Sequence, residues 1–196
     1  MSDFDVSRAV ANLSLGLEHL SASFIVDAGD FSYAREPSWK WPNLTSLALT
    51  SRLLAPNKSP AEIGYMLQAA AAAAMEMPNL ETMEIWNGQE GLAMVFRFQS
   101  ARGGRPSTIT LRGIWELDLR PPVIEAWEAV TLRHGGQGLV IAKESLGPGI
   151  VVKSHGTAIH YLRVSNMVIR PISLRQIWIE HRIRGAHNYG MMPVAS

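Results

Sequence analysis

The six histidines are the residues of this 196-residue chain with the widest chemistry, because an imidazole can ligate a metal ion or carry a proton. Their spacing does not suit a zinc motif, which places two histidines at positions i and i+4 of a helix. His155 and His160 are five residues apart, His181 and His187 are six apart, and the chain contains no cysteine. We predict neither a metal site nor a cofactor, and we expect His155 to begin a helix and to bond to local backbone.

Glycine-rich loops could also support catalysis or nucleotide binding. Residues 134–138 (His-Gly-Gly-Gln-Gly) have the composition of an esterase oxyanion-hole loop, but the chain lacks the Gly-x-Ser-x-Gly turn that carries the nucleophile. Neither glycine-rich phosphate-binding motif is present, and no aspartates cluster in the manner of magnesium ligands. We therefore predict no catalytic residues, and we expect the glycines after His134 to end a helix.

Charged residues give two further candidates for chemistry. Glu81, Glu84 and Glu180 could converge across neighbouring strands, but acid–base catalysis needs a shielded cleft that separates the pKa values of two carboxyls. On an open sheet face we expect solvated charges. The region of residues 97–112 carries four arginines, yet the formal net charge of the chain is only +1. This balance predicts neither a nucleic-acid nor a membrane partner, and we expect these arginines to be solvated.

A repeated pattern predicts the elements that position these residues. Residues 42–44 and 78–80 both read Pro-Asn-Leu, and apolar residues follow each Leu at the third and fifth positions. This Leu-x-x-Leu-x-Leu spacing is the strand signature of a leucine-rich repeat. Residues 174–179 fit the same pattern, and residues 17–22 fit it loosely. The long interval between the second copy and residue 174 predicts an insertion at about residues 88–120.

Periodicity and capping residues predict the remaining elements. We expect a helix over 6–20 that gives way to a strand, a loop over 27–40, strands at 44–50 and 80–86, and a helix over 59–77. The dipeptide Asn87-Gly88 should end the second strand. We further expect a β-hairpin of strands 92–98 and 108–115, a helix over 121–133, a short strand at 139–142, a helix over 154–162 and a last strand at 174–180.

Together these elements predict an α/β fold, namely a short, degenerate leucine-rich-repeat-like β–α solenoid with a largely parallel sheet and an inserted β-hairpin. We expect one domain over residues 1–183 and a flexible tail over residues 184–196. The insertion would cover an otherwise open sheet edge.

Strand alternation predicts which side chains face away from the helices. If Leu47, Leu49, Met83, Ile85, Ile177 and Ile179 point inward, the opposite face carries the predicted binding residues, which are Ser46, Thr50, Thr82, Glu84, Trp86, Gln176, Trp178 and Glu180. Exposed Trp86 and Trp178 would be strong contact residues for a protein partner. In the alternative interpretation, the insertion folds over both tryptophans and they belong to the core.

The repeats resemble those of filamentous-fungal F-box-like proteins with degenerate leucine-rich repeats. The resemblance covers most of residues 17–182 and is carried by residues 41–47, 77–88, 123–130, 154–159 and 171–177. In such proteins the F-box binds the adaptor of a ubiquitin ligase and the repeats hold a client protein. Because this chain begins too late to include a recognisable F-box, the resemblance implies the client-binding part alone.

The sequence therefore predicts a protein–protein interaction module. The alternative is an enzyme that acts on an apolar small molecule, with a pocket between the hairpin and the sheet lined by Phe96, Trp115 and Trp127. A third hypothesis is a remnant without a function of its own. The acidic N-terminus is unlike a secretory signal, and the most apolar window, residues 63–77, is too short to span a bilayer. We expect a cytoplasmic or nuclear protein.

Overall fold

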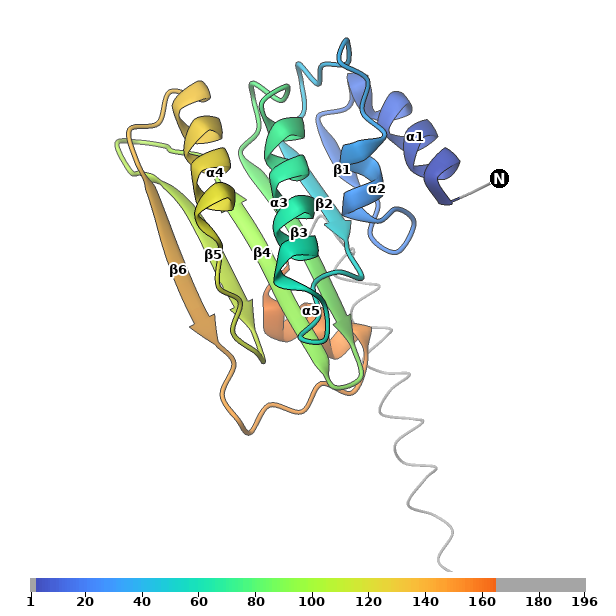
Figure 1. The fold of residues 1–196 in the computed structure, drawn as a ribbon, viewed down its shortest axis with the longest axis vertical. Helices are drawn as coiled ribbons and strands as arrows, with labels where there is room; N and C mark the ends of the chain where they lie inside the picture. Colours follow the sequence, from blue (N-terminus) through green and yellow to red (C-terminus); the bar gives the residue numbers. More distant parts are fainter. Residues whose placement is uncertain (1–2, 165–196) are drawn as a thin grey trace, which may run out of the picture.

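The computed structural model describes residues 3–164, which form one six-stranded sheet with helices on both faces (Figure 1). The strands are β1 (His19–Ser21), β2 (Ser46–Thr50), β3 (Thr82–Gln89), β4 (Leu92–Gln99), β5 (Ser107–Gly113) and β6 (Leu139–Ser145). The helices are α1 (Asp3–Leu13), α2 (Ala28–Tyr33), α3 (Pro60–Ala74), α4 (Pro121–Arg133) and α5 (His155–Leu162), with a 3-10 turn η1 (Ser14–Gly16) after α1.

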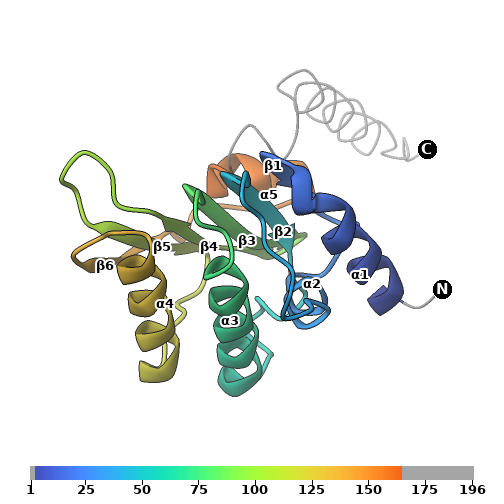
Figure 2. The same cartoon turned by 90° about the horizontal axis from the view of Figure 1, so that it is seen from above.

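The strands lie in the sheet in the same order as in the chain. β1, β2 and β3 are parallel to one another, β6 is parallel to β5, and β4 is antiparallel to both of its neighbours. The helices α2, α3 and α4, which connect parallel strands, lie on one face of the sheet, whereas α5 lies on the other (Figure 2). The predicted α/β class is thus confirmed, and the sheet is mostly parallel with an antiparallel section.

The two clear copies of the repeat lie side by side as the sequence predicts. In the pairing of β2 with β3, Leu47 is opposite Met83 and Leu49 is opposite Ile85. All four side chains are buried in the larger core, beneath α3 and its neighbouring helices. The third copy, at residues 174–180, and the predicted tail lie outside the described residues.

Local signals correctly predict where three helices begin. Ser59 and Glu62 form a reciprocal capping box at the start of α3, with Pro60 at its first position. Pro121 and Pro122 open α4, and the Ser154 hydroxyl accepts a hydrogen bond from the Thr157 N–H at the start of α5. In each case the residues that mark the start of the helix lie within one helical turn of one another along the chain.

Two predictions about loops are wrong. Residues 28–33 form α2 rather than a loop, because Asp27 caps the helix and Phe31 packs its ring against Trp41 at 5.8 Å between centroids. Asn87 and Gly88 do not end β3, since the strand continues to Gln89 and turns at Gly91, which has φ +69°. Pairing with β4 along all eight residues of β3 keeps this dipeptide extended.

The predicted hairpin exists, but it is not an appendage. β4 and β5 pair with each other and occupy the middle of the sheet, between β3 and β6. They join the parallel units on either side, so they do not cover a sheet edge. The physical reason is apolar burial on both faces. Phe96 and Phe98 are buried on the face that α2, α3 and α4 cover, whereas Ala93 and Val95 are buried on the face that α5 covers.

None of the helices in residues 3–164 is both long enough and apolar enough to cross a bilayer.

Candidate functional site

The predicted binding face is largely covered in the structure. Ser46, Thr50 and Thr82 are half-buried, whereas Glu84 and Trp86 are 1% and 0% exposed. Strand alternation placed them on the correct side of the sheet. Of the two interpretations left open for Trp86, the structure supports the core residue over the exposed one, although α5 covers the ring in place of the inserted hairpin. Gln176, Trp178 and Glu180, which were assigned to the same face, lie outside the described residues.

Two arginines hold α5 against the sheet. Arg97 binds the Glu84 carboxylate at 2.6 Å and donates to the carbonyl oxygens of Leu162 and Arg163 at 3.3 and 2.6 Å. Arg112 donates to the carbonyl oxygen of Tyr161 at 2.7 Å. Cations are favourable at a helix C-terminus, where carbonyl groups are left unpaired. These side chains therefore dock the helix, and the prediction that they are solvated is wrong.

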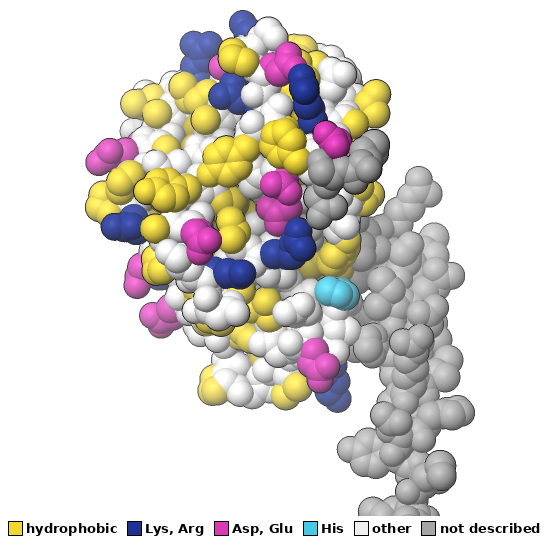
Figure 3. Space-filling model, turned by 45° about the vertical axis from the view of Figure 1, so that its right-hand side comes forward, with side chains coloured by type: hydrophobic (Ala, Val, Ile, Leu, Met, Phe, Trp, Pro, Cys, Tyr) yellow, Lys and Arg dark blue, Asp and Glu magenta, His cyan; other side chains and the backbone are white. Residues whose placement is uncertain are grey.

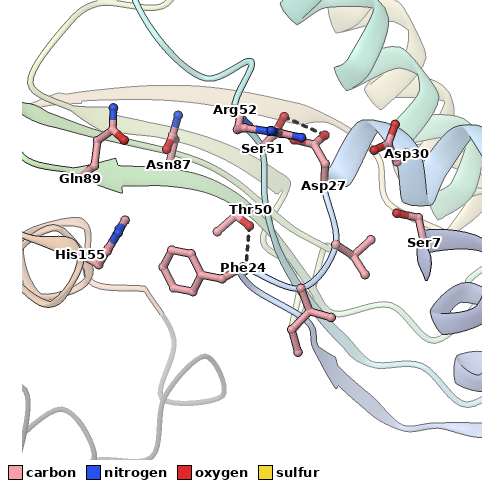
Figure 4. A pocket seen from close by; sticks show the side chains of 12 residues that line it. Ser7, Phe24, Asp27, Asp30, Thr50, Ser51, Arg52, Asn87, Gln89 and His155 are labelled. Atoms are coloured by element: carbon pink, nitrogen blue, oxygen red, sulfur yellow. Dashed lines mark hydrogen bonds between the residues drawn. The ribbon is translucent and has the colours of Figure 1, made fainter. Parts of the chain in front are cut away.

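Because α5 covers the predicted binding face, we take as the candidate site a cavity of about 360 Å³ at the carboxyl ends of β1, β2 and β3. Open sheets with parallel strands commonly bind ligands at this edge, because the loops that follow the strands converge there. The cavity is lined by the loops after β1 and β2, by Asn87 and Gln89 of β3, and by His155 of α5 (Figure 4).

Phe24 is the most unusual residue of this cavity. Its backbone is left-handed, with φ 67°, and its side chain is 54% exposed. For a bulky residue this conformation costs on the order of 1–3 kcal/mol, and such strain clusters at functional sites. Its N–H donates to the Thr50 hydroxyl at 2.9 Å. Its ring meets Trp86 edge-on at 5.0 Å and His155 at 4.9 Å, so the surrounding structure fixes an exposed aromatic side chain.

Trp86 supports Phe24 from beneath. Its indole N–H donates to the Ser23 hydroxyl at 3.0 Å, in the same loop as Phe24. The fully buried ring thus joins β3 to the loop that follows β1. The sequence identified Trp86 as important, but the structure gives it a positioning role in place of a direct contact.

Asp27 joins the two loops that form the cavity. Its carboxylate accepts hydrogen bonds from the Gly29 N–H at 2.8 Å, the Ser51 hydroxyl at 3.2 Å and the Arg52 N–H at 3.0 Å. One side chain therefore caps α2 and fixes the start of the loop after β2. This network gives the cavity a rigid wall.

The neutral His155 ring has a defined tautomer. Its Nδ1 contacts the carbonyl oxygen of Gly88, and because a carbonyl can only accept, Nδ1 carries the proton. Nε2 is then an acceptor. The residue begins α5 as expected, but its backbone partner comes from β3 and is not local.

Comparison with protein families gives a match over most of the chain. The model of a family of unknown function (DUF6546) matches residues 1–170 of the chain. The chain belongs to this family. No curated protein and no solved structure matches it at a significant level.

In this DUF6546 chain the esterase-like segment ends a helix, as predicted. Gly135, with φ +78°, follows the last residues of α4, and its N–H donates to the Leu132 carbonyl oxygen. His134 Nε2 lies 3.2 Å from the Ala74 carbonyl oxygen and donates to it. Burial lowers the pKa of His134, because it disfavours the charged imidazolium; the bond to Ala74 opposes this effect. The ring therefore makes a structural contact with the C-terminal end of α3.

The pocket predicted for an enzyme is mostly filled. Phe96 and Trp127 are fully buried with ring centroids 5.1 Å apart, and only a hollow of about 150 Å³ borders Trp115. Within residues 3–164, no three histidine or acidic side chains cluster closely enough to hold a metal ion. On the face drawn in Figure 3, described side chains of both charges are interspersed with hydrophobic ones.

Sequence reasoning missed Phe24, Asp27, Asn87 and Gln89. The available signal was an apolar pair, Phe24-Ile25, at the end of the predicted first strand and ahead of the polar cap Asp27. Both apolar side chains are exposed, Ile25 by 65%.

Proposed function

We propose that this chain is a polypeptide-binding module whose contact surface is the cavity edge around Phe24. The observation that carries the proposal is an exposed aromatic ring in a costly backbone conformation. An aromatic side chain of this kind loses little conformational entropy on binding and buries a large area. Exposed Ile25 extends the apolar surface, and the polar cavity beside it can fix the orientation of a partner.

The arrangement of β1 to β3 supports a finer proposal about architecture. Each β–α unit adds one parallel strand next to the last, and its helix packs on the same face. This is the progression expected of a degenerate leucine-rich-repeat-like solenoid. Within that proposal, the chain is the client-binding part of an F-box-like protein, and its partner is a client polypeptide.

The test uses three baits: the wild-type chain, Phe24→Asn and Tyr65→Asn. Asparagine tolerates left-handed φ, so Phe24→Asn removes the ring without creating new backbone strain. Tyr65 lies on α3 and is 63% exposed, which makes Tyr65→Asn a matched control. Each bait is incubated with fungal extract, and the captured proteins are quantified by mass spectrometry. Circular dichroism checks that all three baits are folded.

A purified partner is then titrated into each chain by calorimetry. Loss of a buried aromatic contact is worth roughly 1.5–3 kcal/mol, so Phe24→Asn should weaken binding about ten- to a hundredfold. Tyr65→Asn should change the affinity less than twofold. Equal capture by the wild-type and Phe24→Asn chains would refute the proposal. A ubiquitin-ligase adaptor among the Phe24-dependent proteins would support the link to F-box-like proteins.

A further inference from the structure

We infer that the cavity beside Phe24 receives a cationic side chain, lysine or arginine, of the bound polypeptide. This inference rests on the proposed function, because it names the partner group that the same site recognises. It follows from the hydrogen-bonding groups that the cavity offers, from its aromatic wall and from its charge.

The first argument is that the cavity offers hydrogen-bond acceptors. His155 Nε2 is an acceptor in the neutral ring, because Nδ1 donates to the Gly88 carbonyl oxygen. The Asn87 amide nitrogen donates to the Leu54 carbonyl oxygen at 3.2 Å, which leaves its Oδ1 as an acceptor on the cavity side of β3. Gln89 is exposed, and its side chain makes no hydrogen bond within residues 3–164. A ligand rich in N–H donors would satisfy these groups together.

The second argument is the aromatic wall. Figure 4 shows the Phe24 ring and His155 on one side of the opening, and Asn87 and Gln89 from β3 on the other. A cation over an aromatic face is attracted by the quadrupole of the ring, most strongly where water is partly excluded. The edge contacts of Phe24 with Trp86 and His155 fix the ring in this position.

The third argument is charge. The cavity is lined by two carboxylates, Asp27 and Asp30, and by one guanidinium, Arg52. The balance is acidic, and Arg52 lies on the wall that also carries Ser51 and Asp27. An anionic ligand would be disfavoured by the net acidic charge of the lining, and an apolar one would leave the acceptors unpaired. A lysine or arginine head group suits both the charge and the acceptors.

The size agrees with a single side chain. Sites for cofactors and drug-sized molecules occupy roughly 300–1,000 Å³. A volume of about 360 Å³ lies at the lower end of that range. The cavity therefore has room for one long side chain, and the rest of the polypeptide would lie over Phe24 and Ile25.

The test is a nuclear magnetic resonance titration of the whole chain with blocked amino acids. The cationic probes are the N-acetyl methylamides of lysine and arginine. The neutral controls are the corresponding derivatives of norleucine and citrulline, which have similar shapes. We expect saturable shifts at the amides of Phe24, Thr50 and Asn87 and at the Trp86 indole N–H for the cations only. Equal shifts with the neutral probes, or cation binding elsewhere, would overturn the inference.

Three variants sharpen the result. Gln89→Glu adds a carboxylate at the opening and should tighten cation binding about two- to fivefold, as expected for one exposed charge pair. Gln137→Glu makes the same change on an exposed loop after α4 and should leave binding unchanged. Phe24→Asn should weaken binding at least threefold. An equal effect of the two glutamate variants would show that only net charge matters, and it would overturn the assigned site.

The two proposals can fail separately. If a captured partner depends on Phe24 but still binds after its contacting lysines and arginines are replaced by methionine, the present inference fails and the binding module stands. If the cations bind beside Phe24 while no protein distinguishes the wild-type chain from Phe24→Asn, the proposed function fails and the cation chemistry of the cavity stands.

Discussion

Gly88 is the position at which one methyl group should most disturb the site. A Cβ added to Gly88 would lie 2.3 Å from the Cβ of Ala158 on α5 and 3.2 Å from Cζ3 of Trp86. Carbon atoms in contact lie about 3.5–4.0 Å apart, so α5 would have to move away by about 1 Å or more. The backbone of Gly88 is not left-handed, so alanine suits its conformation and the clash is the main effect.

The expected magnitude follows from overpacking. An extra methyl in a well-packed core costs roughly 1–3 kcal/mol, and Gly88→Ala should destabilise the fold by that amount. Ala158→Gly alone should cost about 1 kcal/mol, because glycine is a poor helix former. The double variant has no Cβ–Cβ clash. Its cost should be close to that of Ala158→Gly, which gives a coupling energy of about 1 kcal/mol or more.

The assay is urea unfolding of the four proteins in a double-mutant cycle, followed by circular dichroism. Hydrogen exchange measures where the effect lies. Amides of residues 155–162 should exchange faster in Gly88→Ala, whereas those of α3 should keep their protection. Strictly additive free energies of unfolding would refute the close packing of α5 on β3. So would a Gly88→Ala chain that is as stable as the wild type.

Three further predictions concern single side chains. Arg97→Met should destabilise the chain by about 3–5 kcal/mol in urea unfolding, because the buried Glu84 carboxylate loses its ion pair with Arg97, and adding Glu84→Met should recover part of the loss. Thr131→Val should stabilise the chain by about 1 kcal/mol, since Thr131 is 1% exposed and its hydroxyl makes no hydrogen bond within residues 3–164; a destabilised variant would contradict this. His134 has a pKa lowered from 6.5, so the unfolded chain binds more protons and stability should fall as pH drops through and below 6.5. In His134→Gln, whose amide can still donate to Ala74, that fall should be shallower.

The candidate site was only partly predictable from the sequence. Alternation of apolar and polar residues placed Glu84 and Trp86 on the face opposite the helices, because a strand orients successive side chains by geometry alone. Whether that face is exposed depends on another element. α5 follows β6 in the chain and crosses back to β3 and β4, and no local pattern in residues 154–162 specifies this destination.

Local chemistry therefore determined the elements, and long-range packing determined the site. The caps at Ser59 and Ser154 and the prolines that open α4 were readable because each depends on neighbours in sequence, and the register of the two repeat strands was readable because both copies carry the same spacing of apolar residues. The central place of β4, the left-handed Phe24 and the link from His155 to Gly88 depend on contacts between distant segments. These contacts are chosen by the packing of the whole sheet, so only the tertiary structure decided where an aromatic side chain, two carboxylates and three acceptors would meet.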